Sequence, residues 1–390
     1  MPRLRLLIQL VGAAVLLNGA AVSAHDPSAY GGLFRSRDLG ATWLNADAGL
    51  FLSAALTVAV DPRDPARLLL GTDLGLMRSE SGGRSWTPEA PGLMVGAVFA
   101  LAFRSGGAGA IGAAPGGIFV LGDGGWTGAE APDGALPARA VALGASAQRV
   151  YLAGRSGLFI SDDGGRSFAR APGLPDSAEI TGLAVTREPR ESVFAVVDGA
   201  LMASTDGGRR WQPLADPSER RLETLALDPA SPSRLWAAGA GRIYLSEDLG
   251  ASWRPVGQPL PEPGAAVRGI AADPAITTLV VTTARGMYRS TDGGASWALK
   301  EANLPIHLEA GPLVRDPSDA RTLYAVYSLM PYAEVWRTAL EGSNLLARAD
   351  PVSLAGGVAF LLLLMIAGGL LVRWLARQRG GAPLERGSPS

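Results

Sequence analysis

Apolar residues along this chain fall in short runs that are separated by turn-forming residues. The runs at 56–60 and 68–70 flank the turn Asp61-Pro62, and similar pairs of runs surround three later Asp-Pro turns. Runs this short, rich in Val, Leu and Thr and bounded by Pro and Gly, predict β-strands joined by tight turns. From about residue 30 to 345 no long helical periodicity interrupts the pattern, so this part of the chain is predicted to be all-β.

A second turn recurs after a third apolar run in each unit, with the pattern Ser-x-Asp-x-Gly-x-Ser/Thr-Trp. Five good copies lie at 36–43, 161–168, 204–211, 246–253 and 290–297. Two eroded copies lie at 79–86, where Ser81 replaces the Asp, and at 121–128, which keeps Asp123 but loses the Ser and the Trp. The copies begin 40 to 44 residues apart. A period near 42 residues is typical of one four-stranded propeller blade.

The residue types of this turn have a structural explanation. An Asp side chain accepts hydrogen bonds from backbone N–H groups a few residues further on, and Gly supplies the positive φ of a tight turn. The aromatic residue that ends the motif is large enough to pack between neighbouring sheets. We therefore predict a structural role for Asp38, Asp123, Asp163, Asp206, Asp248 and Asp292.

The repeated turn resembles the Asp-box, or bacterial neuraminidase repeat, of sialidases, sortilin-type receptors and photosystem II assembly factors. With seven phased boxes, an N-terminal leader predicted below and no catalytic set, the chain resembles the photosystem II assembly-factor branch of these propellers over about residues 30 to 345. That resemblance implies an exported seven-bladed propeller that binds membrane-protein partners and is not an enzyme. The predicted membrane anchor of this chain departs from the family pattern.

The two ends of the repeat region are predicted to close the ring. One strand, at 31–35, precedes the first box, and strands without a box are expected at 312–315, 322–327 and 334–338. Pairing these with the N-terminal hairpin makes one shared blade and removes the exposed sheet edges. Six whole blades and one shared blade make seven. Eight blades remain the alternative if the last strand joins a different sheet.

Hydropathy at the two ends of the chain predicts export and a membrane anchor. Residues 1–24 combine a basic start, an apolar run and a small-residue end, which is typical of a secretory signal peptide. The propeller is expected over 25–345 and a linker over 346–351. Residues 352–372 form an uncharged stretch of transmembrane length, and the 373–390 tail that follows is basic. We expect a single-pass protein of a bacterial inner membrane, with the propeller in the periplasm and the C-terminus in the cytoplasm.

Composition excludes several kinds of chemistry. The formal net charge of −1 argues against nucleic-acid binding, and the absence of Cys excludes disulfides and thiolate metal sites. The only histidines are His25 and His307, and we expect no metal and no cofactor. The acidic pairs Asp162-Asp163 and Glu247-Asp248 leave a calcium site as an open alternative. Because the box acids recur once per blade instead of converging on one patch, no catalytic residue is predicted.

Arginines are the candidate binding residues. Several are paired in sequence or lie in neighbouring turns, and on one face of the ring they would dock an acidic partner or lipid headgroups. These candidates are Arg187, Arg190, Arg209, Arg210, Arg220 and Arg221. We therefore expect a non-enzymatic platform that binds a protein partner at the membrane and contacts the bilayer through 352–372. The alternative is a carbohydrate-active protein, either a glycan-binding module or a sialidase-like glycoside hydrolase.

The anchor prediction is tested by truncation. Deleting the chain from Val352 onwards is expected to release the propeller into the soluble periplasmic fraction, because the segment that holds it in the bilayer is lost. Fractionation and immunoblotting measure the distribution of full-length and truncated protein. A truncated chain that still sediments with membranes in high salt contradicts the prediction.

Overall fold

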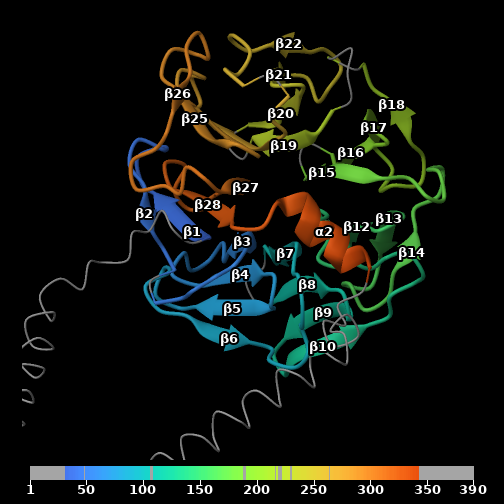
Figure 1. Ribbon diagram of the computed structural model, residues 1–390. Coiled ribbons are helices and arrows are strands. Elements are labelled where there is room, and N and C mark those ends of the chain that lie inside the picture. The colour runs from blue at the N-terminus through green and yellow to red at the C-terminus, as the bar shows by residue number, and fades with distance from the viewer. Residues whose placement is uncertain are drawn as a thin grey trace, which may run out of the picture. The chain divides into compact units, whose positions relative to one another are not determined.

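The computed structural model describes residues 31–47, 49–105, 109–187, 190–215, 217, 222–228, 231–262 and 264–341 (Figure 1). These described residues form seven four-stranded antiparallel sheets, arranged as blades around a central channel. The predicted all-β seven-bladed propeller is thereby confirmed. The predicted leader, linker, membrane span and tail lie outside the described residues. Among the helices that are described, none has the length and apolar character needed to cross a membrane.

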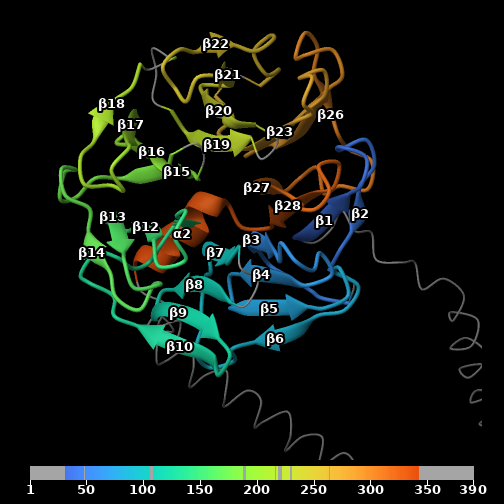
Figure 2. The ribbon, with the colours of Figure 1, turned by 180° about the vertical axis from the view of Figure 1, so that it is seen from behind.

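Each blade adds its strands from the channel outwards (Figures 1 and 2). The innermost strands are β3 (Ala55–Val60), β7 (Ala100–Phe103), β11 (Ala140–Leu143), β15 (Ile180–Thr186), β19 (Thr224–Asp228), β23 (Val267–Ala272) and β27 (Glu309–Arg315). The second strands are β4 (Leu68–Thr72), β8 (Ala110–Ala114), β12 (Val150–Gly154), β16 (Ser192–Val197), β20 (Ser231–Gly239), β24 (Leu279–Thr283) and β28 (Leu323–Ser328).

The outer half of each blade holds the third and fourth strands. The third strands are β5 (Leu76–Ser79), β9 (Gly117–Gly122), β13 (Gly157–Ser161), β17 (Ala200–Ser204), β21 (Arg242–Ser246), β25 (Gly286–Ser290) and β1 (Gly32–Ser36). The fourth strands are β6 (Thr87–Glu89), β10 (Gly125–Ala129), β14 (Ala169–Arg170), β18 (Gln212–Pro213), β22 (Arg254–Pro255), β26 (Ala298–Leu299) and β2 (Leu44–Asn45). Each box motif except that at 121–128 spans the connection between a third and a fourth strand.

One blade, the closing blade, is built from both ends of the propeller, as predicted. Its strand order is β2-β1-β28-β27, and β1 pairs antiparallel with β28 from Gly32↔Tyr327 to Ser36↔Leu323. The hydrophobic core lies between adjacent blades. For example, Phe34 and Tyr327 meet edge to face with ring centroids 5.2 Å apart and pack with Val280 of the next blade. Each blade is thus held by its neighbours, as a ring of this size requires.

Asp47 fastens the first strand of the closing blade. Its Oδ2 accepts a hydrogen bond of 2.9 Å from the backbone N–H of Leu33, and the residue is 2% exposed. Burial is the main influence on this carboxyl and raises its pKa to about 6, because a desolvated carboxylate is disfavoured. A Cβ at Gly32 would lie 2.0 Å from the same oxygen, so only glycine fits beside it.

The third predicted C-terminal strand, at 334–338, is wrong. The chain forms helix α2 (Tyr332–Leu340) there instead. Its most buried side chains recur at helical spacing, at Tyr332, Val335, Trp336 and Ala339, and Pro331 stands before the first turn. The segment has nine residues, and no strand is available for it to pair with. Its apolar face is buried against the ring instead, so no eighth blade forms in the described chain.

Helix α2 lies over the centre of the ring in both ribbon views (Figures 1 and 2). Tyr332 and Trp336 contact the ring of Phe99, with centroids 4.9 and 5.2 Å apart. The guanidinium of Arg139 lies 4.5 Å from the centroid of Trp336, and that of Arg268 lies 4.6 Å from the centroid of Tyr332. Since Phe99, Arg139 and Arg268 lie at or next to the starts of three innermost strands, the helix covers the end of the channel where those strands begin.

Four of the five good box turns share one complete hydrogen-bond pattern. In the first, Gly40 donates its N–H to Ser36 Oγ (2.8 Å), while Ser36 Oγ and the N–H of Thr42 donate to Asp38 Oδ1 (2.8 Å each). The Thr42 hydroxyl donates to Asp38 Oδ2 (2.6 Å). The same contacts recur around Asp163, Asp248 and Asp292.

Three turns vary this pattern. At Asp206 the backbone N–H groups bind, but Arg210 has no hydroxyl to donate. At 79–86 the hydroxyl of Ser81 replaces the carboxylate and accepts the N–H of Ser85 at 2.9 Å. Asp123 departs further, because β9 and β10 pair up to Gly122↔Gly125 and the chain turns through two residues only. The predicted box turn therefore does not form there.

The turn role of the box carboxylate is tested by a matched pair of substitutions. Asp38→Ala is expected to lower the free energy of unfolding by about 1–2 kcal/mol, because several turn donors lose their acceptor. Asp123→Ala is expected to change it by less than about 0.5 kcal/mol, since this exposed side chain stands in a two-residue hairpin. Chemical denaturation of both variants measures the difference. Equal effects at the two positions contradict the assignment.

The pKa of Asp47 predicts a pH dependence. The folded pKa lies above the ordinary value of 3.8, so this group stabilises the fold at low pH and the contribution is lost as pH rises through about 6. Relative to Asp47→Asn, the wild type is expected to lose up to about 3 kcal/mol of unfolding free energy between pH 4 and pH 7. Denaturant titrations at several pH values measure this difference. Parallel pH profiles for the two proteins contradict it.

Candidate functional site

Two turns of every blade lie at the same end of the ring. Neighbouring strands of a blade run in opposite directions. The connection between the first and second strands and the connection between the third and fourth strands therefore lie at the same end of the ring. In several blades a box N–H donates to the first connection: Gly82 to Ala66 O (2.7 Å), Gly164 to Gln148 O (2.8 Å) and Gly293 to Thr277 O (2.9 Å). We call this end the box face. It is opposite the channel end that α2 covers.

Many arginines of the box face tie one blade to the next. Among the described residues, five arginines donate from the guanidinium to a backbone carbonyl of the following blade. These bonds are Arg289 to Leu39 O (3.0 Å), Arg35 to Gly82 O (2.7 Å), Arg104 to Ala147 O (2.7 Å), Arg149 to Gly207 O (2.8 Å) and Arg234 to Pro274 O (3.2 Å). A basic side chain on this face is therefore often structural, and a binding site has to be sought among the others.

The structure brings four of the predicted binding arginines to the box face of one blade. Arg187 and Arg190 lie between β15 and β16, and Arg209 and Arg210 lie in the box between β17 and β18. All four residues are exposed. The other two candidates, Arg220 and Arg221, lie outside the described residues. The blade that runs from β15 to β18 therefore presents four positive charges at one end.

A cavity of about 410 Å³ opens beside this blade, among the box-face ends of the innermost strands. Arg187 and Arg315 line it, together with apolar residues of β3 and β7 that include Val58 and Phe103. Arg315 Nη2 donates to Ala272 O, while Nε and Nη1 are buried without a hydrogen-bond partner. Burial lowers the pKa of this guanidinium, and the charges of Asp228 and Asp273 act in the opposite direction. An anion at this cavity would relieve an unsatisfied buried cation.

Arg315 is not among the binding residues predicted above, although the sequence carries a signal for it. Arg315 precedes the Asp316-Pro317 turn, whereas the residues before the other Asp-Pro turns are Val60, Leu227 and Ala272. A charged residue at an otherwise apolar repeat position is a departure that a fold alone does not require. Comparing repeats position by position would have found it.

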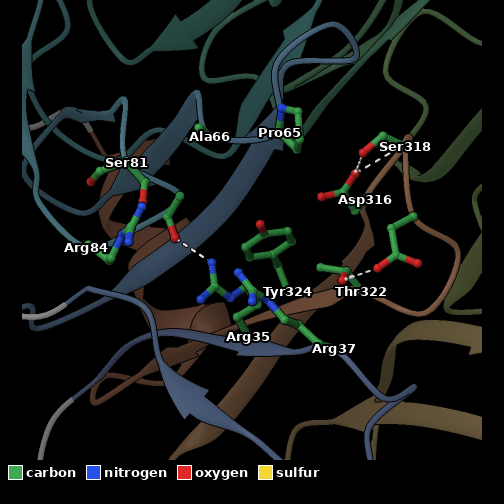
Figure 3. A pocket seen from close by; sticks show the side chains of 12 residues that line it. Arg35, Arg37, Pro65, Ala66, Ser81, Arg84, Asp316, Ser318, Thr322 and Tyr324 are labelled. Atoms are coloured by element: carbon green, nitrogen blue, oxygen red, sulfur yellow. Dashed lines mark hydrogen bonds between the residues drawn. The ribbon is translucent and has the colours of Figure 1, made fainter.

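A second cavity, of about 580 Å³, lies on the box face between the closing blade and the blade of β3 to β6. We call it the inter-blade pocket (Figure 3). The closing blade and the first blade together contribute three arginines, two aspartates and several hydroxyl groups to its lining. Its charged lining residues are Arg35, Arg37, Arg84, Asp316 and Asp319.

The acids of the inter-blade pocket are held in turns. Asp316 Oδ1 accepts the N–H and the hydroxyl of Ser318 (2.8 and 2.7 Å). Asp319 accepts the Thr322 hydroxyl and the N–H of Arg321 (2.7 and 3.0 Å), and these hydrogen bonds, with Thr322 the largest influence, lower its pKa. A general acid in glycoside hydrolysis needs a raised pKa. Asp47, whose pKa is raised, does not line either cavity.

Within the described residues, no group of three or more His, Asp or Glu side chains is arranged to hold a metal ion.

Comparison with known proteins shows two kinds of relative. No protein-family model matches the chain. Xyloglucanases from Paenibacillus sp and Hypocrea jecorina are 30% identical over 184 residues and 31% identical over 125 residues. These matches cover 36% and 30% of this chain, but only 17% and 15% of the xyloglucanases. The chain thus spans less than a fifth of the curated relatives that it matches.

Solved structures share the fold over most of the described chain. YCF48 bound to D1 peptide is 19% identical with a TM-score of 0.53, covering 71% of this chain and 92% of that one. YCF48 from Cyanidioschyzon merolae is 16% identical with a TM-score of 0.56, covering 71% and 97%. The GH74 xyloglucanase from Xanthomonas campestris is 20% identical with a TM-score of 0.50, covering 69% and 51%. At these identities the likeness establishes the propeller fold, and it bears out the predicted resemblance to photosystem II assembly-factor propellers at that level.

Proposed function

We propose that the protein is a non-enzymatic binding platform, and that its box face docks an acidic segment of a protein partner. One observation carries this proposal. Arg187, Arg190, Arg209 and Arg210 stand exposed at one end of a single blade, beside a cavity that holds the unsatisfied guanidinium of Arg315. Converging positive charge with unmet donors suits carboxylate groups, which accept charge-assisted hydrogen bonds from guanidinium.

A peptide is a suitable occupant because of the shape of this region. The cavity of about 410 Å³ lies where the innermost strands end, and its apolar walls are contributed by β3, β7 and β27. An extended segment can place an acidic side chain near Arg315 while neighbouring residues lie over the exposed arginines. One structure with the same fold, YCF48, has been solved with a D1 peptide bound, which supports peptide binding by a propeller of this kind.

We further propose that the platform works at the periplasmic side of a bacterial inner membrane. The support is in the sequence, in the predicted leader at 1–24, the predicted span at 352–372 and the basic tail at 373–390. An anchor confines the propeller near membrane proteins and raises its effective concentration towards them. An assembly role for envelope partners is consistent with such confinement.

Carbohydrate binding is the second candidate, and the segmental similarity to two xyloglucanases favours it. A glycoside hydrolase of the common type would need two carboxyl groups about 5–9.5 Å apart, one of them with a raised pKa. The two acids of the inter-blade pocket are instead engaged in turn hydrogen bonds, and the pKa of Asp319 is lowered. Asp316 and Asp319 therefore do not suit hydrolysis. If the protein binds carbohydrate, we expect it to be a glycan-binding module without hydrolase activity.

The platform is tested by charge reversal. Full-length wild type and a variant with R187E, R190E, R209E and R210E are cross-linked in membranes, and captured proteins are quantified by mass spectrometry. A specific partner is expected with the wild type and about tenfold less of it with the variant, equivalent to about 1.4 kcal/mol. Capture is also expected to fall as the salt concentration rises.

The matched control carries R155E and R242E, two exposed arginines at the opposite end of the ring, one in a second-to-third strand turn and one at the start of β21. This control is expected to retain the partner. A partner captured equally by all three proteins contradicts the assigned face. Specific signals on a glycan array, with no partner captured, favour the second candidate.

A further inference from the structure

The inter-blade pocket departs from the repeat at one residue. Arg37 occupies the second position of its box, where the other boxes that form have Glu80, Asp162, Thr205, Glu247 and Thr291. In two of those blades the acid forms an ion pair with an arginine in or just before the second strand, Asp162 with Arg149 (2.6 Å) and Glu247 with Arg234 (3.3 Å). In the closing blade the sign is reversed. No ion pair joins Arg37 to a carboxylate within the described residues.

Two further arginines stand on the same pocket. Arg84, from the box of the first blade, donates from Nε to Ser81 O (2.9 Å), which fixes its stem and leaves its terminal nitrogens for a ligand. Arg35 holds Gly82 O of the same box (2.7 Å). Arg37 and Arg84 are both exposed. Figure 3 shows Arg84 beside Ser81, and Arg35 and Arg37 nearer to Tyr324 and Thr322. Several guanidinium groups around one space match the geometry and the double charge of a phosphate monoester.

The pocket lining also contains two acidic residues. Figure 3 shows one oxygen of Asp316 bonded to Ser318, and the other oxygen free of that bond and directed into the pocket. Asp319 lies in the same turn, and its carboxylate is ionised at neutral pH because turn hydrogen bonds lower its pKa. Carboxylates of this kind repel an anion and attract an ammonium group. The lining thus carries three formal positive charges and two formal negative charges, and Arg37 is near enough to Asp319 for its charge to help lower the pKa of that carboxyl.

We infer that the inter-blade pocket binds a small zwitterion in which a phosphate monoester or diester is linked by a short chain to a primary ammonium group. The phosphate lies against Arg37 and Arg84, and the ammonium lies against Asp316 and Asp319. A cavity of about 580 Å³ holds such a molecule with water. This inference goes beyond the proposed partner docking, because it requires no protein partner and uses other arginines.

Ligand binding here has a structural consequence. The pocket joins the closing blade, which holds Arg37 and Asp316, to the first blade, which holds Arg84. A ligand that contacts both blades stabilises the closed ring, since it binds the folded state and not the unfolded chain. Thermal unfolding therefore reports occupancy independently of any partner.

The experiment compares four probes on the purified full-length protein in detergent. Phosphoethanolamine, inorganic phosphate, ethanolamine and glycerophosphoethanolamine are titrated by calorimetry and by thermal shift. Phosphoethanolamine or its glycerol ester is expected to bind saturably and raise the unfolding temperature. Phosphate alone and ethanolamine alone are each expected to bind at least about tenfold more weakly, because each meets only one part of the pocket.

Variants test the assigned side chains. R37E with R84E is expected to lower the affinity for the zwitterion by more than about tenfold. R166E, which alters the box position equivalent to Arg84 in another blade and does not line this pocket, is expected to leave it unchanged. The unfolding temperature of each variant without ligand shows whether it folds. The ratio of the wild-type affinities for the zwitterion and for phosphate tests the proposal without any substitution.

The outcomes separate the possible sources of the ligand. Flotation with phosphatidylethanolamine vesicles, but not with phosphatidylglycerol vesicles, by the full-length chain and not by its R37E/R84E variant, identifies a lipid headgroup. Binding of the free zwitterion without such flotation identifies a soluble ligand. The inference is overturned if phosphate binds as tightly as phosphoethanolamine, if neither zwitterion binds saturably, or if R37E/R84E binds like the wild type. None of these measurements depends on whether Arg187, Arg190, Arg209 and Arg210 bind a protein partner, so the two proposals can fail separately.

Discussion

The pairing of β1 with β28 is the constraint on which the rest of the structure depends. Five consecutive residue pairs join the first described strand to a strand almost 300 residues later, and without them the sheets would form an open row with two exposed edges. Asp47 holds Leu33 in place for this pairing, and Phe34 and Tyr327 fill the space towards the neighbouring blade. Closure also creates the inter-blade pocket, because that pocket lies where the closing blade meets the first one.

The arginines of the ring fall into two groups with different contacts. Those that reach the next blade, such as Arg289 and Arg149, bind backbone carbonyls of a box and hold neighbouring blades together. Those that depart from the repeat, such as Arg315 and Arg37, stand at cavities where the other blades have apolar, acidic or hydroxyl residues. Arginines that recur at the same position in several blades and reach the next blade are thus structural. Arginines found at a repeat position in one blade alone are candidate binding residues. With a propeller fold shared by YCF48 and a xyloglucanase, these exceptions carry more functional information than the fold does.

Helix α2 gives the two ends of the channel different properties. At its own end, Tyr332 and Trp336 are sandwiched between Phe99 and the guanidinium groups of Arg139 and Arg268, and burial raises the pKa of the Tyr332 hydroxyl to about 12. That end is filled by aromatic packing. At the box face the channel retains a cavity lined by Arg187 and Arg315. Both cavities to which we assign binding therefore lie at the box face.

The sequence by itself determined the four-stranded repeat and its strand order, because the box turn is local chemistry, whereas the choice between seven and eight blades was decided by the structure of the segment at 334–338. An Asp carboxylate, a Ser hydroxyl and a Gly within eight residues make the turn in five copies, and at 79–86 a Ser hydroxyl takes the place of the carboxylate. Only the tertiary structure decided which charges meet. Arg37 and Arg84 lie in different blades, and Arg187 and Arg315 are more than a hundred residues apart, so their distances depend on closure of the ring. The segment at 334–338 became a helix for a related reason. Its short apolar pattern suits strand or helix, and the uncovered rim around Phe99 favours the helix.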